Sequence, residues 1–317
     1  MPFNNAIALF QMHLIIERAL ASQSSSLYLC NLNLKDIPLS ITRINHLLRL
    51  YLSHNRISQV PKEICQLEEL YSLALDYNKL HSLPPYLISL QTLVKLNLNH
   101  NSLKVIPPEI FHLTNLEILW LNHTELSEIP CEIKNLTKLD TFGARGNNIQ
   151  SLPDEFGCLE NLRWLTLQDN KITHLPKNLY FTSLVHLNLS LNLFTVFPEA
   201  LTKFKDMQFC FFAGNHIKSI SDETLCQLRH LKLLDLHKNP LTEESDLKDY
   251  PFITTLCKGE SDDDSNDEDD SEDWAESVGS SELNTSDEED ILDDLELVRG
   301  GAVLWVPLVS KLLACAY

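Results

Sequence analysis

Residues 47–67 read LLRLYLSHNRISQVPKEICQL, and residues 93–113 read LVKLNLNHNSLKVIPPEIFHL. Both follow the pattern LxxLxLxxNxLxxLPxxIxxL, in which the central LxL alternates with the period of a β-strand. Self-similarity at a fixed period of 20 to 30 residues predicts a solenoid of stacked supersecondary units. The period here is close to 23, and ten copies begin at residues 24, 47, 70, 93, 116, 139, 162, 184, 207 and 231.

The residues that recur within one repeat have separate physical roles. The alternating leucines point to one face, so neighbouring repeats are expected to stack their strands into a parallel sheet. The recurring asparagine can bond backbone groups that the tight turn after the strand leaves unpaired. Thr124 replaces it in the fifth repeat and offers only a hydroxyl, and Leu32 replaces it in the first. The recurring proline fixes φ where the chain crosses to the outer side.

The repeats resemble those of the cytosolic 23-residue leucine-rich repeat group with a Leu-Pro step, which includes Ras-suppressor, Scribble-type and plant intracellular Ras-group-related proteins. The resemblance covers about 220 residues and implies an α/β solenoid, a horseshoe with a parallel concave sheet of about ten strands. In the ninth repeat Ser221–Asp222 replaces the proline, which predicts a longer outer helix capped by Ser221. The resemblance also implies a protein partner, with a small GTPase or a signalling enzyme as the candidate.

Both ends of such a solenoid need covering, because a terminal repeat has a neighbour on one side only. The N-terminal segment predicts an amphipathic helix whose apolar stripe comprises Ile7, Phe10, Leu14 and Ala21. The segment TEESDLKDYPFITTL is expected to cover the other end. We therefore predict four parts: an N-terminal capping helix (1–23), a repeat domain with a C-terminal cap (24–257), a disordered acidic tail (258–299) and an apolar segment of unknown role (300–317).

The charge of the chain is concentrated near its C-terminus. Of the net charge of −19, residues 258–317 hold 19 acidic residues against three basic ones. Such a tail repels nucleic acid and suits basic partners, and its scarcity of apolar residues predicts disorder. Four hydroxyl residues stand three positions before an acid, an offset that resembles casein kinase 2 acceptor sites; the phosphorylation candidates are Ser261, Ser265, Thr285 and Ser286.

The register of the repeats predicts which side chains face solvent on the inner sheet. Counting from the first residue of each repeat, positions 3, 5, 7 and 8 are expected to be exposed. Trp120 therefore stands on this surface between the buried Leu119 and Leu121. Exposed aromatic residues ringed by polar groups are typical of binding hot spots, although they could also simply cover one another. The candidate partner-binding residues are Tyr51, Ile118, Trp120, His123, Arg145, Trp164, Phe209 and Phe211.

No catalytic constellation, cofactor motif or phosphate loop is present in the sequence. His100 and His123 should be neighbours, but a metal site needs a third strong ligand. The scattered cysteines favour a reducing compartment, and no segment has the length of a transmembrane helix. We therefore expect a non-enzymatic scaffold or adaptor, a monomer without cofactors, in the cytoplasm with the nucleus as a second setting. The alternative is a nuclear, histone-binding protein, because some acidic nuclear phosphoproteins also join such repeats to an acidic tail.

Overall fold

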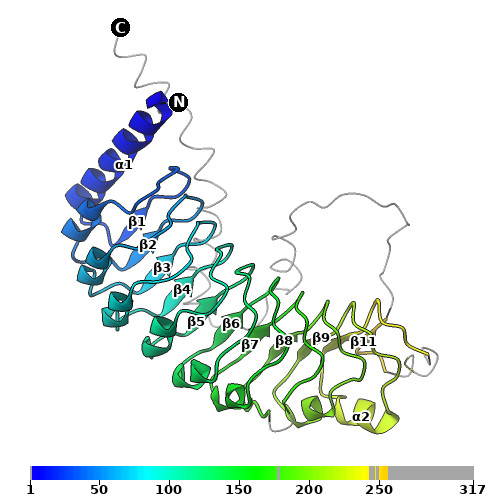
Figure 1. Cartoon of the computed structure of the whole chain (residues 1–317). Helices are drawn as coiled ribbons and strands as arrows, with labels where there is room; N and C mark the ends of the chain where they lie inside the picture. Colours follow the sequence, from blue (N-terminus) through cyan, green and yellow to red (C-terminus); the bar gives the residue numbers. More distant parts are fainter. Residues whose placement is uncertain (1, 177–178, 243–246, 248–249, 256–317) are drawn as a thin grey trace. The chain divides into compact units, whose positions relative to one another are not determined.

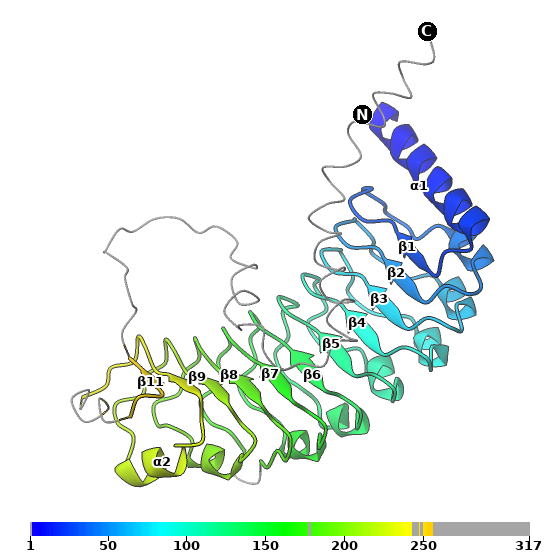
Figure 2. The ribbon, with the colours of Figure 1, turned by 180° about the vertical axis from the view of Figure 1, so that it is seen from behind.

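The computed structural model describes residues 2–176, 179–242, 247 and 250–255, all within the compact unit of residues 1–259. Within these residues eleven short strands form one sheet, whose order follows the chain. All ten neighbouring pairs are parallel. The strands line the inner side of this unit and the helical turns its outer side (Figures 1 and 2). The predicted leucine-rich repeat solenoid is confirmed.

The strands recur at the repeat period and pair without any shift in register. Each of the first ten spans positions 3 to 5 of its repeat. The strands are β1 (Ser26–Tyr28), β2 (Arg49–Tyr51), β3 (Ser72–Ala74), β4 (Lys95–Asn97), β5 (Ile118–Trp120), β6 (Thr141–Gly143), β7 (Trp164–Thr166), β8 (His186–Asn188), β9 (Phe209–Phe211), β10 (Leu233–Asp235) and β11 (Ile253–Thr254).

Most outer segments are single 3-10 turns that begin directly after the recurring proline. The seven turns within the described residues are η1 (Leu39–Arg43), η2 (Lys62–Gln66), η3 (Pro85–Ser89), η4 (Pro108–His112), η5 (Cys131–Asn135), η6 (Asp154–Cys158) and η7 (Glu199–Lys203). The preceding prolines hold φ between −57° and −75°, as their rings require. The ninth repeat instead carries the α-helix α2 (Asp222–Gln227), where the Thr224 N–H donates to Ser221 Oγ at 3.3 Å. The predicted Ser221 cap is thus confirmed.

The core is a column of side chains enclosed between the sheet and the outer turns. Leu119 and Leu121 of the fifth repeat are fully buried, as the strand alternation predicts. In the later repeats phenylalanines replace several leucines of the column. Phe156 packs edge-to-face against Phe142 and Phe181, with ring centroids 5.6 and 6.1 Å apart, a favoured aromatic geometry. The core therefore runs continuously from repeat to repeat.

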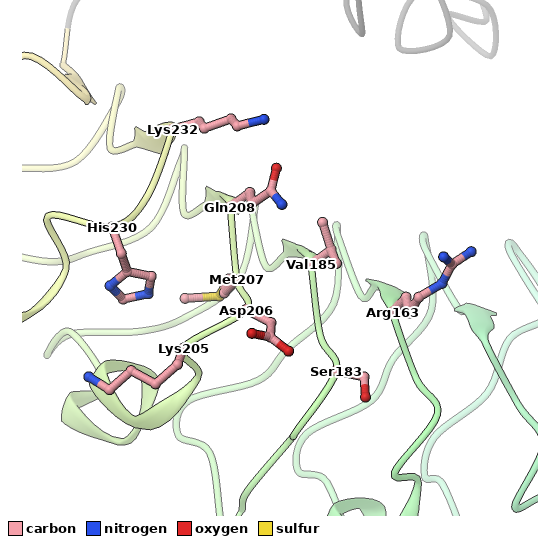
Figure 3. A pocket seen from close by; sticks show the side chains of 9 residues that line it. All are labelled: Arg163, Ser183, Val185, Lys205, Asp206, Met207, Gln208, His230 and Lys232. Carbon is pink, nitrogen blue, oxygen red and sulfur yellow. The ribbon is translucent and has the colours of Figure 1, made fainter. Parts of the chain in front are cut away.

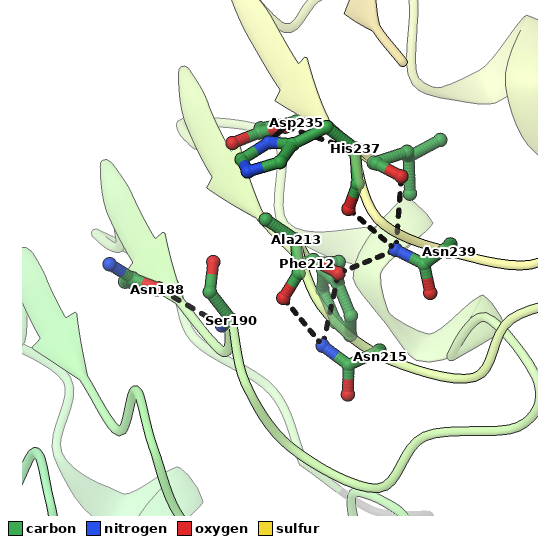
Figure 4. Close-up of polar contacts among 9 residues, drawn as sticks. Asn188, Ser190, Phe212, Ala213, Asn215, Asp235, His237 and Asn239 are labelled. Atoms are coloured by element: carbon green, nitrogen blue, oxygen red, sulfur yellow. Dashed lines mark hydrogen bonds and ion pairs between the residues drawn. The ribbon is translucent and has the colours of Figure 1, made fainter. Parts of the chain in front are cut away.

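The recurring asparagines bond backbone groups within and between repeats, as predicted. The amide nitrogen of Asn215 donates to the carbonyls of Phe212 at 3.0 Å and Ala213 at 3.4 Å, and that of Asn239 donates to the same Phe212 carbonyl at 2.8 Å (Figure 4). These side chains satisfy buried carbonyls that would otherwise lack donors. The asparagine ladder thus joins each turn to the turn before it.

Thr124 interrupts this ladder and alters the adjacent loop. Its hydroxyl donates to the Leu121 carbonyl at 2.6 Å and lies 3.2 Å from Asn147 Oδ1. A hydroxyl cannot reach as many partners as an amide. The preceding loop takes another path, in which Lys104 adopts a φ of 64° and its N–H donates to the Thr124 carbonyl at 3.0 Å. Thr124 thus makes some of the hydrogen bonds that asparagine makes in the other repeats.

The N-terminal helix α1 (Pro2–Ser22) packs on β1 and η1, but with a face other than the predicted stripe. Phe10 and Leu14 are exposed, whereas Ile16 and Ala19 are buried. The predicted stripe is therefore wrong in detail. The buried face of the helix is determined by its contact with the first repeat, and the apolar periodicity of the helix alone does not predict it. No helix among the described residues has both the length and the apolar composition needed to cross a bilayer.

The opposite end of the sheet is completed by backbone pairing. The predicted C-terminal cap contributes β11, which pairs with β10 in the register Leu234↔Ile253. Leu247 and Tyr250 form a small buried cluster with Leu225 of α2. The sheet therefore has one strand more than the ten repeats supply.

Candidate functional site

The inner surface of β5 to β9 carries most of the predicted binding residues. The register aligns Ile118, Thr141, Trp164, His186 and Phe209 in one row across the five strands. A second row, two residues further along each strand, runs from Trp120 through Gly143, Thr166 and Asn188 to Phe211. Ile118, Trp120, Trp164, Phe209 and Phe211 are all half-buried. The strand alternation thus brings the predicted residues of these strands onto one surface.

Four rings of β7, β8 and β9 form a continuous group, which we call the aromatic strip: Trp164, His186, Phe209 and Phe211. Trp164 and His186 stack with ring centroids 3.8 Å apart and an interplanar angle of 5°. The His186 ring then lies 5.1 Å from Phe211 and 6.5 Å from Phe209. The repeat register predicts the tryptophan and the phenylalanines on this face, but His186, which joins them, was not among the predicted binding residues.

His186 behaves as an aromatic residue of this surface and not as a charge. Its side chain is only 7% exposed, and this burial lowers its pKa to about 4 because the charged form loses its hydration. Its Nδ1 is buried and has no hydrogen-bond partner among the described residues. The imidazole is therefore neutral at physiological pH. The expectation that positions 3, 5, 7 and 8 are exposed is wrong here, since the Trp164 indole covers this residue. It is also wrong at other residues of positions 3, 5 and 7 that are buried: Ser72, Ala74, Gly143, Ser53, Ser190 and Ala213.

Trp120 lies against the neighbouring strand instead of projecting freely. A Cβ atom at Gly143, its register partner on β6, would collide with Cε3 and Cζ3 of the Trp120 indole. The absence of a side chain at this glycine allows the indole to lie on the strand. Trp120 thus keeps one face on the sheet and remains half-buried. Trp120 and Trp164 both lean toward the C-terminal end of the sheet, because each indole lies over the strand that follows its own.

Polar groups border these aromatic residues at position 7 of the repeats. The Arg145 N–H donates to Asn122 Oδ1 at 2.8 Å, and the Asn122 N–H donates to Asn99 Oδ1 at 2.7 Å. The Nε of Arg145 is buried without a hydrogen-bond partner among the described residues. Arg145 therefore stands at the end of this row of amides.

Position 8 of the repeats forms a separate stack of rings, which we call the rim ladder: His54, Tyr77, His100 and His123. Successive ring centroids are 4.1, 4.0 and 4.5 Å apart, and each residue has a positive φ between 51° and 56°. The ladder ends at Gly146, where a Cβ atom would collide with the His123 ring. The predicted neighbourhood of His100 and His123 is confirmed, and no group of three or more potential metal ligands occurs among the described residues.

The remaining predicted residues lie elsewhere. Tyr51 stacks on Tyr28 at the N-terminal end of the sheet, with ring centroids 4.6 Å apart and planes 4° from parallel. It is thus remote from the aromatic strip along the strand order. The phosphorylation candidates Ser261, Ser265, Thr285 and Ser286 lie outside the described residues.

Comparison with known proteins agrees with this architecture. Two family models described as leucine-rich repeats match residues 91–149 and 46–67. A leucine-rich repeat protein of Leptospira interrogans is 30% identical, with a TM-score of 0.59 over 71% of this chain and 64% of that one. The functional domain of InlJ from Listeria monocytogenes is 26% identical, with a TM-score of 0.58 over 69% and 45% of the two chains. A search of curated proteins found no match.

A third similar structure is a plant receptor with its ligand. The ectodomain of GASSHO1/SCHENGEN3, a membrane receptor kinase of Arabidopsis thaliana, was solved in complex with CASPARIAN STRIP INTEGRITY FACTOR 2. It is 25% identical, with a TM-score of 0.59 over 70% of this chain and 31% of that one. The chain spans less than two thirds of each of these three structures. The chain is thus a leucine-rich repeat solenoid, of a fold whose solved examples include protein-interaction modules.

Proposed function

We propose that this protein is a non-enzymatic scaffold or adaptor that binds a protein partner on the inner surface of its sheet. The observation that carries the proposal is the aromatic strip together with Trp120 on the same inner surface. The strands that bear these residues are each paired with a neighbouring strand on both sides. Aromatic side chains that are half-buried before binding supply large contact area at low cost in conformational entropy. The polar row that ends at Arg145 would form the rim of such an interface.

The similar plant structures support a role in ligand binding, since two of them are complexes. One contains CASPARIAN STRIP INTEGRITY FACTOR 2, and the other is the peptide hormone receptor RGFR1 with RGF2. The resemblance of the repeats to the Ras-suppressor group points to a signalling role for this chain. The proposed partner is accordingly a small GTPase or a signalling enzyme, the proposed setting is the cytoplasm or the nucleus, and the proposed binding unit is a monomer.

Affinity purification with the full-length protein tests this proposal. The wild type is compared with Trp164→Ala and with Tyr86→Ala, a control that removes an exposed aromatic side chain from the outer turn η3. We expect a stoichiometric protein partner with the wild type and the control, and its loss with Trp164→Ala. With the purified partner, loss of a hot-spot aromatic should weaken binding about thirtyfold, or about 2 kcal/mol.

The contrary result is equally clear. Equal recovery of the partner by Trp164→Ala and Tyr86→Ala, with both variants folded by circular dichroism, would place the binding surface elsewhere. Trp120→Ala serves as a second probe of the same surface. If both tryptophans contact one group of the partner, the double variant should lose less binding energy than the sum of the single variants.

A further inference from the structure

A polar hollow of about 540 Å³ lies at the edge where the strands begin (Figure 3). Four of its lining residues immediately precede β7, β8, β9 and β10: Arg163, Val185, Gln208 and Lys232. Each therefore adjoins, along the backbone, the first inner-surface residue of its strand. The Lys232 ammonium, 5.9 Å from the centroid of the Phe209 ring, joins the hollow to the aromatic strip.

The lining of the hollow has more positive than negative groups. Arg163, Lys205 and Lys232 face it together with His230, against the single carboxylate of Asp206. Cations gathered in a recess raise the local concentration of anions. Residues 1–257 as a whole have slightly more acidic than basic residues, so the excess of positive charge is local to this hollow.

The lysines of the hollow are held in place without a carboxylate. The Lys232 ammonium lies 5.9 Å from the centroid of the Phe209 ring, a cation–π contact with the aromatic strip. The Lys205 ammonium donates to the Thr202 carbonyl at 2.8 Å. Neither forms an ion pair with a described acidic residue, whereas Arg163 pairs with Asp140 at 2.5 Å. Among the residues that the structure describes, these two cations therefore have no acidic partner.

The back of the hollow is equally ordered. His230 directs one ring nitrogen at the Gln227 carbonyl and the other at the Phe204 carbonyl, each at 3.1 Å. Met207 beneath it is fully buried. These two side chains therefore lose little conformational entropy when a ligand enters the hollow.

We propose that this hollow binds acidic side chains of an extended partner segment whose apolar residue packs on the aromatic strip. The inference rests on the proposed function and adds the chemistry of the ligand. From the start of β7 to the start of β10 there are three strand spacings, or roughly 14 Å. An extended segment covers that length in about four residues. A segment that crosses the hollow can therefore bring its aspartates or glutamates to Lys205 and Lys232, the two cations without an acidic partner among the described residues.

Carboxylates of a protein segment fit the hollow better than a nucleic acid does. The positive groups occupy a single recess, and residues 1–257 carry 25 acidic against 22 basic residues. Nucleic-acid binding instead needs a broad basic surface along the phosphate backbone. The aromatic strip at the edge of the recess supplies the apolar contact that a peptide side chain requires.

Selection of short random peptides displayed on phage against the full-length protein tests the inference. The enriched peptides should carry two acidic residues beside an apolar one. A soluble copy is then titrated by calorimetry against the wild type, Lys232→Glu, Lys205→Glu and the control Lys134→Glu, which makes the same charge change at an exposed site on η5. Each reversal in the hollow should weaken binding roughly tenfold and the control should not.

The pairing itself is tested by changing the peptide. Replacing its acidic residues by their amides should weaken binding to the wild type but weaken it much less to Lys232→Glu, because the charge partner is already gone. Affinity equal for Lys232→Glu, Lys205→Glu and Lys134→Glu would overturn the inference. Enrichment of peptides without acidic residues, or no enrichment at all, would do the same, since the inference requires an extended acidic segment.

The variants also separate this inference from the proposed function. If Trp164→Ala abolishes peptide binding while both lysine reversals leave it unchanged, the inner surface binds but the hollow does not. If neither Trp164→Ala nor a lysine reversal affects binding, both proposals fail.

Discussion

Gly143→Ala provides a direct test of how Trp120 lies on the sheet. Gly143 is part of β6 and does not have a positive φ, so its backbone accepts alanine without strain. The added methyl group would, however, collide with the six-membered ring of the Trp120 indole. The substitution should therefore displace the indole and leave the β6 backbone in place.

The size of the effect follows from two opposing terms. Without the indole, glycine to alanine at a compatible site stabilises the fold by about 0.4–1 kcal/mol, through the lower entropy of the unfolded chain. With the indole present, an off-rotamer tryptophan costs about 0.5–1.5 kcal/mol, and the contact with the strand is lost as well. Gly143→Ala should thus be neutral or destabilising in the wild type and stabilising in Trp120→Ala, with a coupling energy of roughly 1–2 kcal/mol.

Urea unfolding of the wild type, both single variants and the double variant measures this coupling. The far-ultraviolet circular dichroism signal is suitable, because it reports mainly on the backbone and does not rely on tryptophan fluorescence, which the substitution changes. A coupling energy below about 0.5 kcal/mol, the range of independent sites, would refute the placement of the indole on Gly143. A destabilised double variant would show that the glycine is needed for another reason.

Three further predictions concern stability. Leu121→Ala should lower the free energy of unfolding by about 2–5 kcal/mol, because this leucine is fully buried, whereas Trp120→Ala should lower it by only about 1 kcal/mol; equal losses in urea would contradict the register. Thr124→Asn should raise it by about 1–2 kcal/mol, since the amide restores bonds made in the other repeats, and a destabilised variant would disprove this. Burial of His186 should make the protein less stable as the pH is lowered. Above pH 6.5 the imidazole is mainly neutral in both the folded and the unfolded chain, but between pH 6.5 and about 4 it is protonated in the unfolded chain and stays neutral in the folded one. The loss should reach about 3 kcal/mol, and His186→Phe should lack this part of the pH dependence.

Periodicity alone predicted the sheet, its direction and its register. One apolar residue at every second strand position, repeated ten times, leaves a single arrangement that buries all of them. The placement of Trp120 between Leu119 and Leu121 followed from that rule. The Ser221 cap also followed, because capping depends on local chemistry alone.

What the sequence could not reveal depends on contacts between neighbouring repeats. Exposure at position 3 varies with the side chain on the preceding strand, so a rule for single repeats missed the burial of His186 under Trp164. The role of Gly143 appears only when the Trp120 indole lies over it. The buried face of the N-terminal helix was likewise chosen by the first repeat. A signal for the basic hollow was present in the sequence, since Arg163 and Lys232 both stand at position 2 of their repeats.

The position of the aromatic strip along the repeat array determines which local unfolding events expose it. In an array where each repeat contacts only its neighbours, unfolding begins at the ends and spreads inward. The strip on β7 to β9 has six described strands on one side but only β10 and the two-residue β11 on the other. Fraying from the C-terminal end therefore reaches the strip sooner than fraying from α1. A partner that joins β7 to β10 should slow amide hydrogen exchange at this end and leave exchange in β1 to β3 unchanged.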